Sequence, residues 1–128
     1  MATEPVTRAP VLLVVDDEVR ILSALRRSLR REGYEILTAD TAREALELLD
    51  AHPIDAILCD QRMPGMSGAE LLARAAERRP NAARILITGW TESLPPEQLE
   101  ALAVHALIAK PWDDAALKQT LREVMPGP

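Results

Sequence analysis

Val11-Leu12-Leu13-Val14-Val15 is an unbroken apolar run, and three acids, Asp16-Asp17-Glu18, follow it directly. A strand of this composition has no polar side chain to turn toward water, so it suits a position covered on both faces, as in a parallel sheet. The abrupt change from apolar to acidic residues marks the end of the strand. The stretch therefore predicts a buried parallel strand with carboxylates at its carboxyl end.

The same sequence of an apolar run and then a helical stretch recurs along the chain. Further runs begin near Tyr34, Ile54, Arg84 and His105 (YEILTA, IDAILC, RILIT and HALIA). The first of these is mixed, which favours a place nearer an edge, whereas the other three suit strands covered on both faces. Apolar residues at helical spacing follow the five runs: Leu22, Leu25 and Leu29; Ala42, Ala45, Leu46 and Leu49; Leu72, Ala75 and Ala76; Leu99, Leu102 and Ala103; Leu117, Leu121 and Val124.

Five strand–helix units with short links predict an α/β fold. We expect a doubly wound, five-stranded parallel sheet between two layers of helices, in the flavodoxin-like strand order 2-1-3-4-5. Thr41-x-x-Glu44 and Ser67-x-x-Glu70 have the capping-box pattern of helix starts, and Gly33 lies where the first helix should stop.

The composition limits the size of the fold and the class of protein. The 128 residues suffice for one domain, expected at 11–125 between flexible tails at 1–10 and 126–128. A net charge of −5 argues against direct nucleic-acid binding by this domain. No apolar run approaches the about 18 residues of a membrane span. The single cysteine, Cys59, fits a reducing, cytoplasmic setting.

Polar residues stand at the ends of four predicted strands. Besides the first acids, these are Asp60, Thr88-Gly89 and Lys110-Pro111. Ligands of open parallel sheets bind beyond the carboxyl ends of the strands, where the strand order reverses, so we expect these groups to meet in one crevice. An alternative for Asp17 is a helix N-cap.

Three neighbouring carboxylates repel one another unless a cation intervenes, and an oxygen-rich cluster suits Mg²⁺. Zinc is a poor match because His52 and His105 lie elsewhere and Cys59 should point away from Asp60. With Mg²⁺ bound, one carboxylate could attack a phosphoryl donor while Thr88 and Lys110 hold its oxygens.

Four fragments in this order resemble a bacterial response-regulator receiver domain: VVDDE at 14–18, DQRMPGMSG at 60–68, ITG at 87–89 and KPW at 110–112. The resemblance runs from Val11 to about Val124. The second and fourth fragments also look like receivers joined to DNA-binding transcription regulators or to cyclic-di-GMP hydrolases.

The resemblance implies a phosphorylation switch of a two-component system. Asp60 would accept a phosphoryl group from a sensor histidine kinase or a phosphotransfer protein, Thr88 would move toward that group, and Lys110 would pair with it. The Mg²⁺ ligands would be Asp17, Asp60 and the backbone carbonyl of Arg62, with Asp16 holding the ion through water. A cis Lys110-Pro111 bond would aim the ammonium group, and Pro64 and Gly68 would shape the loop after Asp60.

The resemblance further implies that phosphorylation shifts the face made by the fourth helix, fifth strand and fifth helix. That face would control an output domain or a downstream partner, and a homodimer could form through it. The family carries Tyr or Phe three residues before the lysine, where this chain has Leu107. Either the usual coupling between this residue and Thr88 is altered, or Leu107 is ordinary core filling.

Several residues have two interpretations. Arg62 and Trp90 could shield or contact the phosphorylated aspartate, or lie on an exposed loop. The cluster of Arg26, Arg27, Arg30 and Arg31 is either a solvated helix face or a docking surface for a kinase. Structural roles are expected for His52 as a helix cap, for His105, for Cys59 as a buried apolar residue, and for Trp112 as packing at a helix start, or alternatively part of an interface.

Two other functions compete with the switch. A Mg²⁺-dependent phosphohydrolase with an aspartyl intermediate would carry an acid two residues after its nucleophile, where this chain has Arg62. A flavin-binding module would need a phosphate-cradling loop after the first strand, where this chain has acids.

Overall fold

The structure, a computed structural model, describes residues 9–89 and 104–125. Within them lies a parallel sheet of β1 (Val11–Val15), β2 (Glu35–Ala39), β3 (Ala56–Asp60), β4 (Ala83–Gly89) and β5 (Ala106–Lys110). Its order, β2-β1-β3-β4-β5, is the predicted one. β2 lies on one side of β1, and β3 and the later strands lie on the other side. The strand order therefore reverses between β1 and β3, and a crevice is expected at the carboxyl ends of these two strands.

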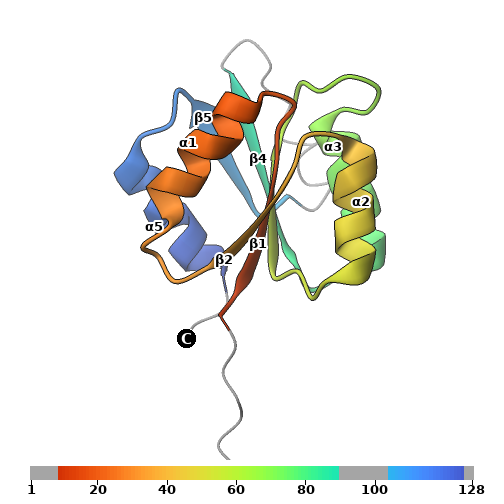
Figure 1. Cartoon of the computed structure of the whole chain (residues 1–128), viewed down its shortest axis with the longest axis horizontal. Coiled ribbons are helices and arrows are strands. Elements are labelled where there is room, and N and C mark those ends of the chain that lie inside the picture. Colours follow the sequence, from red (N-terminus) through yellow and green to blue (C-terminus); the bar gives the residue numbers. More distant parts are fainter. Residues whose placement is uncertain (1–8, 90–103, 126–128) are drawn as a thin grey trace, which may run out of the picture.

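Helices cover both faces of the sheet (Figure 1). On one face lie α1 (Val19–Leu29) and α5 (Asp114–Val124), and on the other lie α2 (Ala42–Ala51) and α3 (Gly68–Arg78). The expected helix around Leu99, Leu102 and Ala103 lies outside the described residues, as do Trp90 and the tail segments 1–8 and 126–128.

Alternation along the strands divides the core in two. Leu12, Val14 and Leu58 belong to the cluster beneath α1 and α5, and Leu13, Val15 and Cys59 belong to the cluster beneath α2 and α3. Cys59 is fully buried and its side chain faces the second cluster. Because side chains alternate along a strand, the side chain of Asp60 points to the opposite face of the sheet, as predicted. Burial raises the pKa of the Cys59 thiol, which keeps it protonated and inert.

The two outer strands are less covered than the inner ones. β2 is partly exposed, in keeping with its mixed sequence. The expectation that HALIA is covered on both faces is wrong for β5, because this strand is at the end of the sheet order. Leu107 is 43% exposed, so it is not core filling.

Thr41 and Ser67 cap the helices that follow them, as predicted. Thr41 Oγ1 accepts from the Glu44 N–H at 3.0 Å, and Ser67 Oγ accepts from the Glu70 N–H at 3.1 Å. The return bond of each capping box differs, since Glu44 Oε1 accepts from the Asp40 N–H and Glu70 Oε1 accepts from the Ser67 hydroxyl. The predicted stop of the first helix at Gly33 is wrong by a few residues, because α1 ends at Leu29 with Arg30 as its C-cap; Gly33 lies in the turn before β2 with a φ of +89°, which favours glycine.

Candidate functional site

The carboxyl edge of the sheet brings together the side chains that the sequence predicts. Asp16 follows β1, Asp60 ends β3, and Lys110 ends β5. Lys110 Nζ lies 2.6 Å from Asp60 Oδ1 and 3.7 Å from Asp16 Oδ2. Oxygens of Asp16, Asp17 and Asp60 all lie within 4.8 Å of one another. Three acids and one ammonium group therefore form a single cluster.

Local backbone geometry holds Asp16 in place. Its N–H donates to the Ala39 carbonyl of β2 at 3.2 Å, and its Oδ1 accepts from the Glu18 N–H at 2.9 Å. Asp16 is 1% exposed, yet its Oδ2 accepts no hydrogen bond. A buried carboxylate oxygen without a donor is costly unless a cation neutralises it. Asp17, by contrast, is exposed to solvent at the rim of the cluster.

Asp60 is held by the chain that follows it. The Gln61 N–H donates to the Ile87 carbonyl of β4 at 3.0 Å, and the Gln61 carbonyl accepts from the Gly68 N–H at 2.9 Å. The Gln61 side chain accepts from the Ala69 N–H at 2.9 Å, so it closes the loop onto the start of α3. The sequence carried no signal for this role of Gln61, because it depends on the loop returning to its own start.

Gly68 makes that return possible. A Cβ at this position would overlap the Asp60 carbonyl oxygen and would lie 2.8 Å from the Asp60 carbonyl carbon and 2.9 Å from Gln61 Cα. All three contacts are with backbone, so no side chain could move aside. The predicted part of Gly68 in shaping the loop after Asp60 therefore has a steric basis in the structure.

The charges of the cluster shift two pKa values. Burial and the negative charge of Asp60 raise the pKa of Asp16 to about 6, although the Glu18 N–H and Lys110 act in the opposite direction. For Lys110, burial lowers the pKa, but the hydrogen bond to Asp60 and the charges of Asp60 and Asp16 outweigh it, and the pKa is raised. Lys110 therefore remains an ammonium group at neutral pH.

The other predicted site residues lie at the same edge but outside the cluster. Thr88 is buried near the end of β4, and its hydroxyl donates to the Gly89 carbonyl at 3.1 Å. Arg62 lies two residues past Asp60 in the loop before α3, with an exposed side chain. The Lys110-Pro111 bond is cis, as the resemblance implies.

The residues predicted to be structural have structural contacts. The His52 N–H donates to the Leu48 carbonyl and caps α2. His105 Nδ1 accepts from the Arg84 N–H at 2.9 Å. Trp112 packs against the core beneath α1 and α5, and its Nε1–H donates to Asp114 at 3.1 Å.

Comparison with known proteins gives a consistent family. The model of the response regulator receiver domain matches residues 12–122. The hydrogenase transcriptional regulatory protein HoxA of Cupriavidus necator is 43% identical over 118 residues, which are 89% of this chain and 24% of that protein. Sporulation initiation phosphotransferase F of Bacillus subtilis is 28% identical and is covered over 93% of its length, with 90% of this chain. This chain thus spans about a quarter of HoxA.

Solved structures agree with the sequence relatives. The signal receiver domain of an HD domain-containing protein from Pseudomonas fluorescens Pf-5 superposes with a TM-score of 0.83 at 31% identity, covering 91% of this chain and 94% of that one. A CheY-like receiver from Methanospirillum hungatei gives 0.82 at 31% identity, covering 90% and 92%. None of the helices in the described ranges has the length and hydropathy that a bilayer span needs.

Receiver domains are phosphorylation-controlled signalling switches rather than enzymes in the usual sense, and they bind Mg²⁺ through acidic residues. Receiver domains as a family interact with histidine kinases or phosphotransfer proteins and with output domains. The family match over most of the chain, the strand order and the acidic cluster lead to one conclusion: this chain belongs to the response regulator receiver domain family.

Proposed function

We propose that Asp60 is the phosphoacceptor of this receiver. A carboxylate oxygen of Asp60 attacks the phosphorus of a phosphohistidine on a kinase or phosphotransfer protein. The new P–O bond forms as the P–N bond breaks, and the imidazole leaves with the electron pair and takes up a proton. The observation that carries the proposal is the 2.6 Å contact between Lys110 Nζ and Asp60 Oδ1, because it sets a fixed positive charge beside the carboxylate that reacts.

The donor set fits Mg²⁺. Its three side chains all offer carboxylate oxygens, and they include the buried Oδ2 of Asp16, which accepts no hydrogen bond and has Lys110 Nζ 3.7 Å away. Asp17, Asp60 and the backbone carbonyl of Arg62 would hold the ion directly, and Asp16 would hold it through water. When bound, Mg²⁺ supplies positive charge that offsets the repulsion between the acids and the incoming phosphoryl oxygens.

Lys110 and Thr88 act on the product of the transfer. Lys110 Nζ lies between the two buried acids, so it can turn from Asp60 to an oxygen of the phosphoryl group without leaving the cluster. The Thr88 hydroxyl would exchange its bond with the Gly89 carbonyl for one with a phosphoryl oxygen. The move of the Thr88 hydroxyl would change the packing at the end of β4. Because β4 pairs with β5, where Leu107 lies opposite Leu86, this change can reach Leu107.

The face expected from the fourth helix, fifth strand and fifth helix, of which the structure describes β5 and α5, is the proposed route to the output domain or partner. Leu107 projects from that face, and an aliphatic side chain there can pack against a partner but cannot donate a hydrogen bond. Pairing of two copies through this face belongs to the same proposal. Sedimentation velocity before and after phosphorylation would detect it as a shift from monomer to dimer.

Incubation with acetyl phosphate and Mg²⁺, followed by intact mass measurement, tests the proposal. The parent chain should gain one phosphoryl group, which then decays, and Asp60→Asn should gain none. Asp50→Asn is the matched control, because Asp50 is an exposed α2 acid that pairs with Arg78 and should leave phosphorylation unchanged. A gain of the same size in Asp60→Asn would refute the proposal.

A further inference from the structure

A groove at the far end of α1 lies apart from the acidic cluster. Arg26, Arg27 and Arg30 line it from the last turns of the helix, and Tyr34 and Ile36 line it from β2. Its volume is about 310 Å³. Arg30 lies about 16 Å along the helix from Val19, at the rise of an α-helix, whereas the acidic cluster adjoins the opposite end.

No ion pair joins Arg26, Arg27 or Arg30 to an acid within the described residues, although the exposed Glu35 of β2 stands between Tyr34 and Ile36. α1 contains no acidic residue, although the whole chain has a net charge of −5. The nearest acid after the helix, Glu32, is held by Arg122 of α5 in two contacts of 2.9 and 3.2 Å. The hydrogen bond of Arg26 within the described residues is to the neutral hydroxyl of Thr38, at 3.4 Å. Three arginines therefore line an open groove that a negatively charged partner would fit.

The groove borders the open side of β2. β2 ends the sheet order and pairs on one side with β1. The Glu35 N–H points to that side, because it donates to the Pro10 carbonyl at 2.9 Å. By the alternation of a parallel ladder, the N–H and C=O groups of Ile36 and Thr38 point the other way, to the open side. Such an edge can accept a further strand.

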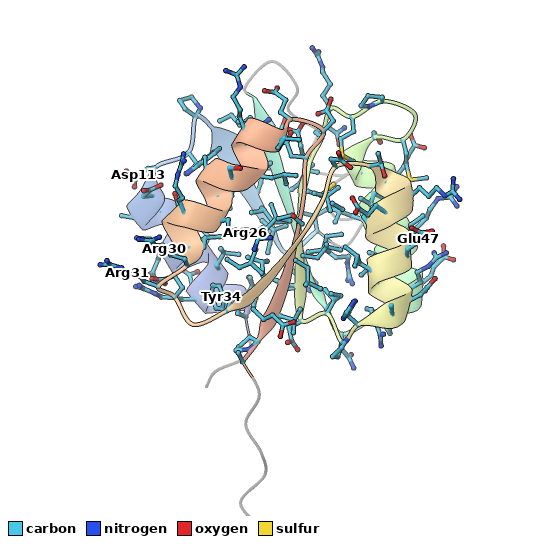
Figure 2. All side chains as sticks on the ribbon, viewed as in Figure 1. Arg26, Arg30, Arg31, Tyr34, Glu47 and Asp113 are labelled. Carbon is cyan, nitrogen blue, oxygen red and sulfur yellow. The ribbon has the colours of Figure 1, made fainter. Side chains whose placement is uncertain are left out.

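The spacing of charges matches that of an extended chain. Arg26 and Arg30 are one helical turn apart, about 6 Å along the axis. Alternate residues of an extended segment are about 6.6 Å apart and point to the same face. Figure 2 shows Arg26 reaching from α1 toward the strands, with Tyr34 below the same end of the helix, whereas Arg31 points outward.

We infer that this groove binds an extended acidic segment of a partner protein, which adds a strand to the open edge of β2. Two of its alternate acidic side chains pair with Arg26 and Arg30, Arg27 adds positive charge beside them, and its apolar atoms lie on Tyr34 and Ile36. A free nucleotide fits less well, because the cavity is at the small end of ligand pockets, about 300–1,000 Å³, and leaves the main-chain groups of β2 unused.

Fluorescence anisotropy with the 128-residue chain tests the inference. The probe is a labelled peptide of about nine residues in which glutamate alternates with threonine. Arg26→Glu and Arg30→Glu should each weaken binding about tenfold or more. Arg31→Glu makes the same charge change outside the groove and should alter binding by less than about twofold, because charge pairs in contact outweigh distant ones.

Changes in the peptide test the added strand separately. A peptide with the same residues in two blocks, glutamates and then threonines, should bind about tenfold more weakly. Two further peptides carry N-methyl groups on the odd-numbered or on the even-numbered amides. One of the two should lose binding and the other should keep it, because only every second N–H of an added strand points to β2. Equal effects of Arg31→Glu and Arg30→Glu, or no effect of methylation in either peptide, would overturn the inference. The inference would also be overturned if ATP bound more tightly than the peptide and this binding depended on Arg26. A third contrary result is that the peptide does not bind and the chain instead forms a dimer that Arg30→Glu dissociates.

Discussion

Replacement of Gly68 by alanine is expected to damage the phosphorylation site from outside it. The added Cβ would overlap the Asp60 carbonyl oxygen and would lie 2.8 and 2.9 Å from two further backbone atoms. Ordinary contact begins at 3.4 Å, so the end of β3 or the start of α3 must move by at least about half an ångström. That movement shifts the Asp60 carboxylate away from Lys110 Nζ, which is now 2.6 Å away.

The size of the effect follows from the steric conflict. Overpacking against fixed backbone costs about 1–3 kcal/mol, whereas alanine at the start of α3 gains up to about 1 kcal/mol in helix propensity. We expect a net loss of stability of about 1–2 kcal/mol and a phosphorylation rate at least about tenfold lower, because positional errors below 1 Å are costly in phosphoryl transfer.

Thermal unfolding and the rate of phosphorylation by acetyl phosphate measure the two effects of Gly68→Ala. Gly33→Ala is the control: it places a Cβ at positive φ with nothing within 4 Å, far from the site. It should lose stability without any change in phosphorylation rate. If Gly68→Ala raises the melting temperature and keeps the parent rate, then the close approach of α3 to Asp60 does not position the carboxylate.

Three further predictions concern charge and capping. The native pKa of Asp16 is raised from 3.8 to about 6, so the native state binds more protons in that range, and metal-free stability should fall as pH rises from about 4 to 6, by up to about 3 kcal/mol. Urea unfolding at each pH should show that this fall is smaller in Asp16→Asn, and equal curves for the two proteins would contradict it. Lys110→Met should leave Asp60 and Asp16 without their cation, which weakens retention of the phosphoryl group in the mass assay, and an unchanged yield and decay would count against its role. Thr41→Ala removes the cap of α2 and should cost about 1 kcal/mol in the same urea measurement, with phosphorylation unchanged.

The meeting of the acids could be predicted because it depends on where the apolar runs end, and the sheet order because five strand–helix units with short links favour a doubly wound sheet. Each run stops at a polar residue, and parallel strands place their carboxyl ends at one edge. The sequence could not show that Asp16 is buried and Asp17 exposed. The two side chains point in different directions, and which of them points into the protein depends on how β1 is placed in the sheet.

Other features depend on contacts between distant segments. The Thr88 hydroxyl could face the acids or its own chain, and only the packing of β4 shows that it bonds the Gly89 carbonyl. The exposure of Leu107 follows from the place of β5 at the end of the predicted sheet order, whereas the apolar composition of its own run favoured burial. The arginine groove also needs Tyr34 and Ile36 beside α1, and the helix sequence alone reads as a solvated face.

The central claim is that Asp60, held beside Lys110 and Asp16, is the residue that carries the phosphoryl group. Tandem mass spectrometry of the chain after reaction with acetyl phosphate, with the acyl phosphate first reduced to homoserine, locates the modified position most directly. We expect homoserine at position 60 alone, and only when Mg²⁺ was present. Modification at another aspartate, or at position 60 to the same extent without Mg²⁺, would contradict the account.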